Sequence, residues 1–248
     1  MSNNYEEDYD EDNCDITASS YNNMCDELYD KLYEICKCKD VDGFNSIVNN
    51  AAVTVVNDIL SKCFEEACWS GDCNVVEFLI DKVVDINRVI FDGCSYLHIV
   101  CSFKNADINY YNIAKLLLDN GININSVDHY GDTCLHCACQ YNSPNSISVI
   151  KLLIENNIDV NAKDECGLTA LHHVCIYGYI DIVVLLTDNG ANIMDKCYGG
   201  DTFREYTLRY RRYDVYKYLE KQIYKRLYVL SLVVQKDVFK RYVAKNVF

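Results

Sequence analysis

The segment GDTCLHCACQ, residues 131 to 140, places three cysteines around one histidine. Thiolate and imidazole are the usual ligands of structural zinc, and neighbouring thiols can also support redox chemistry. Zinc modules commonly supply their cysteines as two separated C-x-x-C pairs. Neither CKC at residues 36 to 38 nor the series Cys63, Cys68 and Cys73 has that paired spacing. Free cysteine also serves as a small apolar side chain, so the choice depends on where else the pattern occurs.

Catalytic patterns are missing from the sequence. It contains no G-x-S-x-G nucleophile elbow, no phosphate-binding glycine loop and no H-E-x-x-H metal helix. Aspartate and glutamate are plentiful but scattered, with no pair placed for acid and base catalysis. We therefore expect no catalytic residues, no bound metal and no cofactor, and predict that the protein is not an enzyme.

The histidine and cysteine pattern recurs along the chain. GCSYLHIVC begins at residue 93, GDTCLHCAC at 131 and GLTALHHVC at 167, so the offsets are 38 and 36 residues. Self-similarity at this period is typical of a solenoid made of stacked units. The residues that recur in step define a structural repeat motif: Gly93, Leu97, His98, Gly131, Leu135, His136, Gly167, Leu171 and His172.

The segments between these motifs are also alike. IAKLLLDNGININSVD, VIKLLIENNIDVNAKD and IVVLLTDNGANIMDKC each predict an amphipathic helix, a glycine or asparagine at its end, and a short alternating stretch. Weaker copies lie at 32–48, 64–88 and 200–222. The sequence therefore predicts an all-α solenoid of helix-turn-helix units with β-hairpin fingers, about six units long, whose outer units are degenerate.

GDTCLH and GLTALH resemble the G-x-T-P-L-H signature of the ankyrin-repeat family, and NNIDVNAKD resembles its G-A-D-V-N-A-x-D finger. The likeness covers residues 28–222, although the signature proline is absent and two units carry longer inter-helix loops, as in ankyrin proteins of large DNA viruses. The resemblance implies that Cys139, aligned with Cys101 and Cys175, packs between units and that His136 hydrogen-bonds backbone there. A metal- or redox-responsive role for the cysteines stays the alternative.

Charge divides the chain unevenly. Residues 204–248 hold 12 Lys and Arg against 4 Asp and Glu, a net of +8, so the overall net of −14 leaves −22 for residues 1–203. We predict an acidic disordered tail at 1–27, the repeat domain at 28–222 and a basic capping helix at 223–248. The acidic balance argues against nucleic acid as a partner.

The sequence also predicts the compartment of the protein and whether it can span a membrane. The acidic N-terminus does not resemble a signal peptide, and an odd number of cysteines, 15, favours reduced thiols. The longest apolar run, YVLSLVV, has seven residues and cannot span a membrane. We expect a cytoplasmic protein, with the nucleus as a second compartment, and leave its oligomeric state open.

The resemblance also implies a binding face, because ankyrin proteins generally bind through their finger tips and the exposed side of their inner helices. It predicts a non-enzymatic module that binds a protein with a basic surface. A narrower hypothesis is a virus-encoded host-modulating protein similar to the inhibitors of NF-kappaB. The aromatic residues could instead pack against neighbouring units. The predicted partner-binding residues are Trp69, Phe91, Phe103, His129, Tyr130, Tyr141, Glu165, Leu168, Tyr177, Tyr198 and Tyr210.

Overall fold

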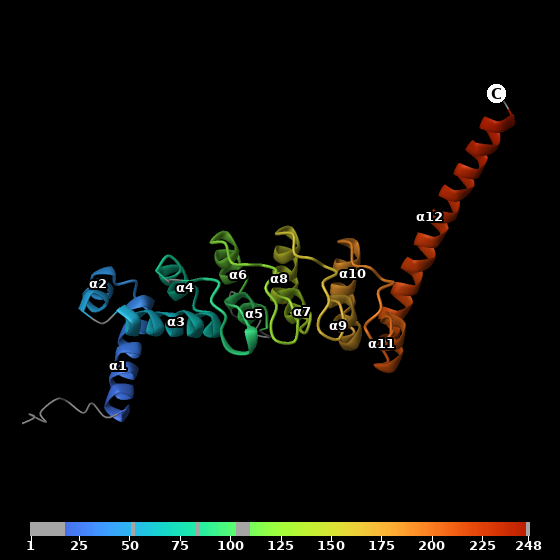
Figure 1. The fold of residues 1–248 in the computed structure, drawn as a ribbon. Coiled ribbons are helices and arrows are strands. Elements are labelled where there is room, and N and C mark those ends of the chain that lie inside the picture. The colour runs from blue at the N-terminus through green and yellow to red at the C-terminus, as the bar shows by residue number, and fades with distance from the viewer. Residues whose placement is uncertain (1–17, 51–52, 83–84, 103–109, 247–248) are drawn as a thin grey trace, which may run out of the picture.

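The computed structural model describes residues 18–50, 53–82, 85–102 and 110–246. Its helices alternate between an inner and an outer row (Figure 1). The inner row is α1 (Ala18–Lys37), α3 (Val53–Ser70), α5 (Tyr96–Cys101), α7 (Cys134–Ala138), α9 (Ala170–Tyr177) and α11 (Phe203–Arg209). The outer row is α2 (Val41–Asn50), α4 (Cys73–Leu79), α6 (Tyr110–Asp119), α8 (Pro144–Glu155), α10 (Ile180–Asp188) and α12 (Tyr213–Asn246).

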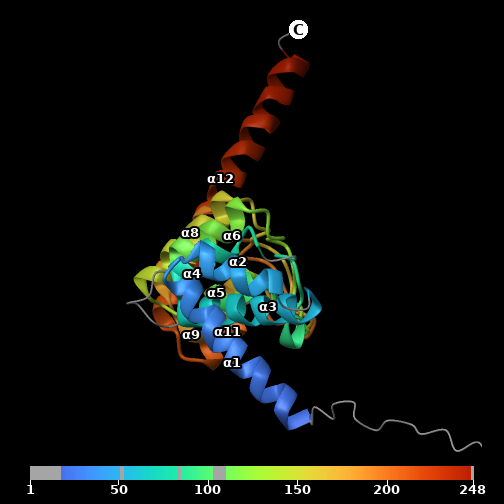
Figure 2. The same cartoon turned by 90° about the vertical axis from the view of Figure 1, so that its left-hand side faces the viewer.

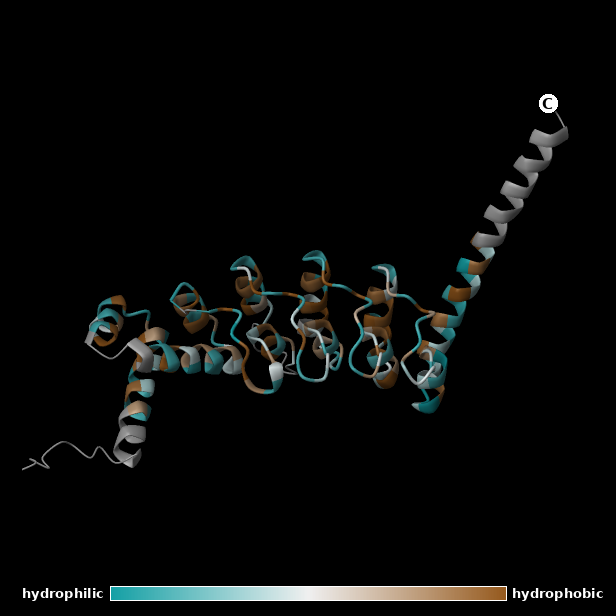
Figure 3. Cartoon of the chain, in the orientation of Figure 1, coloured by the Kyte–Doolittle hydropathy of each residue, from teal (hydrophilic) through white to brown (hydrophobic). Residues whose placement is uncertain are grey.

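Six helix pairs therefore follow one another in the described part of the chain, which confirms the predicted solenoid. From α3 onward, each inner helix packs on its own outer helix and on the inner helix of the next unit. Viewed along the row, the pairs lie behind one another (Figure 2). Hydrophobic residues lie along the helices and hydrophilic residues on many of the connecting loops (Figure 3). The core is consequently a continuous strip between the two rows.

Each short inner helix from α5 onward begins with the same hydrogen-bonded cap. In α7 the backbone N–H of Thr133 donates to Nδ1 of His136 at 3.1 Å, and the Thr133 hydroxyl lies 2.9 Å from the same nitrogen. Because Nδ1 accepts from an N–H, Nε2 carries the ring proton and donates to the Leu168 carbonyl of the next unit at 3.2 Å. The signature histidine thus caps its own helix and ties it to the following unit.

The outer helices end as the sequence predicts. Gly121, Asn157 and Gly190 follow α6, α8 and α10, and all three have positive φ. The residue after Gly121 returns its backbone N–H to the Leu117 carbonyl at 3.1 Å, and the residue after Gly190 makes the equivalent bond to Leu186 at 2.9 Å. A left-handed residue followed by this backward bond terminates a helix while satisfying its last carbonyls.

The fingers, which connect each outer helix to the next inner helix, differ from the predicted β-hairpins. Within the described ranges they contain one isolated antiparallel bridge, between Val127 and Thr133, and no extended strand pair. In that finger, Oδ1 of Asp128 accepts the backbone N–H groups of Tyr130 and Asp132. This side chain closes the turn so tightly that little chain is left for strand pairing.

Neighbouring fingers are joined to one another through the backbone. The N–H of His129 donates to the Asp92 carbonyl at 2.9 Å, and the N–H of Glu165 donates to that of Tyr130 at 2.9 Å. The N–H of Tyr198 repeats the pattern toward Cys166 at 3.0 Å. Within its own finger the N–H of Asp128 donates to the Asp132 carbonyl at 3.0 Å, so the fingers are bonded both internally and to their neighbours.

The two ends of the row depart from the regular unit. Helix α1 begins at Ala18, ahead of the predicted start at residue 28, and residues 1–17 of the predicted acidic tail lie outside the described ranges. At the other end, α12 runs continuously through the predicted boundary at 222/223 and projects beyond the row (Figure 1). Both outer units are degenerate, as expected.

The first turns of α12 cover the C-terminal end of the row. Val215, Leu219 and Ile223 recur every four residues on one face of α12, and all three are buried. Arg204 of α11 forms an ion pair with Glu220 of α12 at 2.6 Å. The side chains that follow, up to residue 229, are mostly exposed. Among the described side chains, those of 213–223 cover the end of the row, and the capping role of 223–248 stays a prediction because the side chains from 230 onward lie outside the described ones.

Candidate functional site

The predicted partner-binding residues form what we call the finger face, made of the finger tips and the ends of the inner helices. Tyr130 and Tyr198 are the most exposed, at 66% and 73%, while Leu168 is half-buried. Phe103 lies outside the described residues. The described members from the fingers are Phe91, His129, Tyr130, Glu165, Leu168 and Tyr198, and those from the inner-helix ends are Trp69, Tyr141, Tyr177 and Tyr210.

One aromatic contact joins the two parts of this face near the N-terminal end. The rings of Trp69, at the end of α3, and Phe91, in the next finger, stack with centroids 5.7 Å apart and planes 19° apart. Phe91 opens the 3-10 turn η1 (Phe91–Gly93), which presents it beside the helix. Both rings remain partly exposed. Helix end and finger therefore offer one continuous aromatic surface.

A second aromatic group lies farther along the row. The rings of Tyr177, the last residue of α9, and Tyr179 stack 5.6 Å apart with an interplanar angle of 9°. Burial raises the pKa of Tyr177, and the charges of Tyr141, Tyr179 and Tyr210 raise it further. Tyrosines from three successive units are thus close enough to interact. These tyrosines, which lie near the ends of successive inner helices, combine packing between units with exposed ring surface.

Charged groups converge beneath the fingers between α7 and α9. Oδ1 of Asp164 accepts the backbone N–H groups of Cys166 and Leu168, both at 2.8 Å. Its other oxygen lies 3.1 Å from Nε2 of His173, which is also 3.9 Å from Oδ1 of Asp132. Burial raises the pKa of Asp132 to about 6, and the positive charge of His173 opposes that rise.

The neighbouring signature histidine is neutral in this setting. Burial lowers the pKa of His136 to about 4, and the charge of His173 lowers it further. The rings of His136 and His173 meet edge to face, 5.3 Å between centroids. Sequence reasoning did not single out His173, so it missed this group. The signal was the doubled histidine of GLTALHHVC, the only one of the three motifs to carry it.

The cysteines of GDTCLHCAC, residues 131 to 139, lie in the core. The fourteen cysteines in the described part of the chain are free. Cys101, Cys139 and Cys175 are buried at equivalent places in successive inner helices. Burial raises the pKa of the Cys139 and Cys175 thiols, and it raises the pKa of Cys36 and Cys63 to about 12. Protonated, buried thiols act as small apolar side chains, as the ankyrin resemblance implied.

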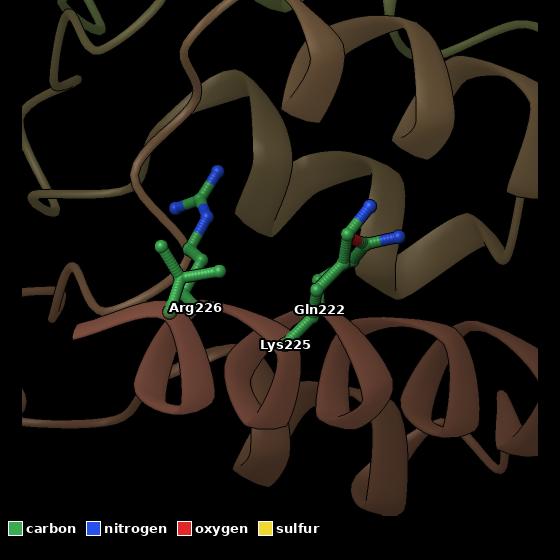
Figure 4. A pocket seen from close by; sticks show the side chains of 4 residues that line it. Gln222, Lys225 and Arg226 are labelled. Atoms are coloured by element: carbon green, nitrogen blue, oxygen red, sulfur yellow. The ribbon is translucent and has the colours of Figure 1, made fainter. Parts of the chain in front are cut away.

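A basic pocket lies beside α12, away from the fingers. Gln222, Lys225 and Arg226 project from one side of the helix (Figure 4), and Val229 completes the lining. Its charge is opposite in sign to that of the carboxylates on the finger face. The described helices include none that combines the length and the apolarity needed to cross a bilayer.

Comparison with known proteins agrees with this geometry. A family model described as ankyrin repeats (3 copies) matches residues 64–164 and 143–226. The two matches together run from the end of α3 into α12 and include every complete copy of the motif. No curated protein sequence matches the chain.

Proposed function

The chain belongs to the ankyrin-repeat family, and from this premise we propose that it binds a partner protein through the finger face. Ankyrin repeats generally mediate interactions between proteins. Their stacked units keep the backbone rigid, so the exposed side chains of successive fingers stay in fixed relative positions. That arrangement suits recognition of a folded surface rather than chemistry on a small substrate.

The exposed aromatic residues of the finger face carry this proposal. Tyr130 and Tyr198 are two thirds or more exposed at the tips of separate fingers, and the Trp69–Phe91 stack lies in line with them along the row. Exposed apolar surface that gathers on one face of a protein marks a candidate interaction site. Tyr and Trp are also the residue types most enriched among interface hot spots.

The charge of the same face supports a partner with a basic surface. Carboxylates lie among the aromatic side chains, and Asp92 and Glu165 are exposed in two different fingers. Complementary charge speeds encounter and orients the two proteins as they dock. A face of this sign repels the phosphates of nucleic acid, so we expect no nucleic acid there.

A narrower form of the proposal is a host-modulating role for a virus-encoded protein similar to the inhibitors of NF-kappaB. The acidic charge of the solenoid and its lengthened loops support it. The D-S-G-x-x-S phosphodegron of the cellular inhibitors does not occur in the sequence. Retention of a Rel-type protein on the immobilised chain at low salt is the expected result. Absence of any Rel-type protein at low salt would remove this narrower form and leave the general one standing.

The cysteine-based alternative has weaker support. Cys139 and Cys175, at the inter-unit positions, are buried, and burial raises the pKa of both thiols, so they offer little of the thiolate that metal binding or disulfide exchange requires. Fourteen free cysteines in the described part suit a reducing compartment. We therefore propose the cytoplasm, or the nucleus, as the place where the protein acts.

The finger face is tested with a paired variant and a matched control. Tyr130→Ala combined with Tyr198→Ala removes two exposed rings and should weaken the captured partner's affinity at least tenfold, as measured by calorimetry or surface plasmon resonance. Tyr224→Ala is the control, because Tyr224 is also 66% exposed but lies on α12. A partner whose affinity falls equally in the control, or only in the control, would show that another surface does the binding.

A further inference from the structure

The row of fingers has an open edge at its N-terminal end. The N–H groups of His129, Glu165 and Tyr198, each two residues before a glycine of positive φ, all donate to a carbonyl of the preceding finger. Phe91 is the equivalent residue of the first finger, and its N–H makes no hydrogen bond to any described residue. No finger precedes it, because only two residues separate α2 from α3. The first finger therefore keeps a donor that the later fingers use for stacking.

A hollow lies beside this open edge. Its volume is about 560 Å³, within the range of pockets that bind ligands. One wall is a stripe on α3 made of Asp58, Ser61, Lys62 and Glu65, whose spacings of three and four residues place them on one side of the helix. The other wall is the segment 88–91 that leads into the first finger. Since α3 precedes this finger in the row, the hollow lies on the side where a preceding finger would stack.

One residue that lines the hollow carries a buried polar group without a partner. Tyr96 has no exposed surface, and its hydroxyl forms no hydrogen bond with any described residue. The Ser61 hydroxyl lies close to it but donates to the Asn57 carbonyl at 2.8 Å. A buried hydroxyl without a hydrogen bond costs free energy. A ligand in the hollow would supply the partner that this hydroxyl lacks.

The walls carry both signs of charge in equal number. The cations are Lys62 and Arg88, and the carboxylates are those of Asp58 and Glu65. Arg88 and Asp58 also pair with each other at 3.5 Å. Such a lining selects neither an anion nor a cation. It suits a neutral peptide backbone, which carries one donor and one acceptor in almost every residue.

We propose that a short extended segment of a partner protein binds in this hollow and takes the place of the missing finger. One of its carbonyls accepts the Phe91 N–H, just as the Asp92 carbonyl accepts that of His129. The Tyr96 hydroxyl bonds to a second backbone group of the segment. Addition of a peptide backbone to an open edge is a recurrent mode of recognition. The inference rests on the proposed function, since the hollow meets the finger face at Phe91, whose ring stacks on Trp69.

The test selects twelve-residue peptides from a random library displayed on phage, with the full chain as the target, and measures their affinity by fluorescence anisotropy. Phe91→Pro and Phe91→Ala form a matched pair, because both remove the ring and only proline also removes the backbone N–H. Proline is tolerated there, since Phe91 is the first residue of η1 and Ile90 before it is extended. The selected peptides should bind Phe91→Pro about fivefold more weakly than Phe91→Ala, the effect of one backbone hydrogen bond.

A second set of variants fills the hollow. Ser61→Trp should weaken the selected peptides at least tenfold, and Val89→Trp, at an exposed position of the same lining, replaces it should circular dichroism show that Ser61→Trp does not fold. Tyr224→Trp is the control, because it places the same side chain on α12, outside the hollow. Hydrogen exchange of the amides in segment 88–94 of the wild type should slow at least tenfold when a peptide is bound.

The outcomes separate this inference from the proposed function. Peptides that lose affinity when Tyr130 and Tyr198 are replaced by alanine, and not in Ser61→Trp, would support the finger tips and overturn the hollow. Equal affinity for Phe91→Pro and Phe91→Ala, or a library that yields no peptide sensitive to Ser61→Trp, would also overturn it. A dimer of the wild type that Ser61→Trp dissociates would overturn it as well, by making a second copy of the chain the occupant.

Discussion

The signature position can serve two purposes. Its side chain caps its own helix and bonds to the next unit at His98 and His136, whereas Glu205 only caps. Nδ1 of His98 accepts the backbone N–H of its own cap at 3.1 Å, and Nε2 lies 3.0 Å from the Asp132 carbonyl of the next unit. In the last unit Glu205 stands at this position, and its carboxylate accepts the backbone N–H of Thr202 at 2.7 Å. No further finger follows α11, so a residue that only caps is sufficient there.

The glycine of the motif is required by the neighbouring finger. Gly131 has a φ of +75°, and a Cβ built there would lie 2.8 Å from the backbone nitrogen of Glu165. Gly121 has a similar φ of +81° but no heavy atom within 4 Å of its added Cβ. A non-glycine residue would therefore strain the backbone at both positions, but only at Gly131 would its Cβ also clash with the next finger.

We predict that Gly121→Ala lowers the free energy of unfolding by about 1–2 kcal/mol, from the left-handed backbone alone. Gly131→Ala should cost roughly 1–3 kcal/mol more, because backbone atoms of the next finger cannot move aside as a side-chain tip would. Urea denaturation followed by circular dichroism measures both. Equal losses in the two variants would mean that the fingers separate easily and that their close approach is unimportant.

At the scale of elements, small side chains set how closely the inner helices approach. Cys101, Cys139 and Cys175 occupy one register in α5, at the end of α7 and in α9, and Cys139 has no exposed surface. Inner helix packs on inner helix along this part of the row. Side-chain bonds add to the stacking at the outer edge, where Oδ1 of Asn161 accepts the backbone N–H of Asn192 at 2.8 Å.

The packing role of the cysteines predicts an asymmetric response to side-chain size. Cys139→Ala removes one buried atom and should cost about 1 kcal/mol, whereas Cys139→Leu overfills the space and should cost about 1–3 kcal/mol. Exposed Cys166→Ala, the control, should stay within about 0.5 kcal/mol of the wild type. Unfolding curves in urea with reductant present give the values. A Cys139→Leu variant as stable as the wild type would contradict tight inter-unit packing.

At the scale of the whole molecule, charge is unevenly distributed along the chain. The sequence assigns a net of −22 to residues 1–203 and +8 to 204–248. Helix α12 runs past the end of the row (Figure 1), and its first turns bury Val215, Leu219 and Ile223 against the solenoid. One helix thus closes the core with its first part and presents positive charge with the turn that follows.

This division predicts different effects for two leucines of one helix. Leu219 has no exposed surface, and Leu219→Ala should cost about 2–5 kcal/mol in the last unit. Leu227 is 56% exposed, and Leu227→Ala should change stability by no more than about 0.5 kcal/mol. Because repeat proteins can unfold locally, hydrogen exchange of the α11 amides is the sharper measurement. Equal exchange rates in both variants would place the cap elsewhere on α12.

The sequence by itself determined the repeat, its period, the helix caps and the small residues between units. These features depend on side chains a few positions apart, such as the glycine and asparagine ends of the outer helices, or on a pattern that each unit repeats. The sequence also determined the family, because several short motifs recur in a fixed order.

Only the tertiary structure decided which side chains of different units meet. Trp69 reaches Phe91, and Asp132, Asp164 and His173 converge although 41 residues separate the first from the last. The fingers are tight turns, in which bonds between units add to the backbone bonds that close each finger. Such contacts depend on the rotation and spacing of stacked units, which local periodicity does not encode.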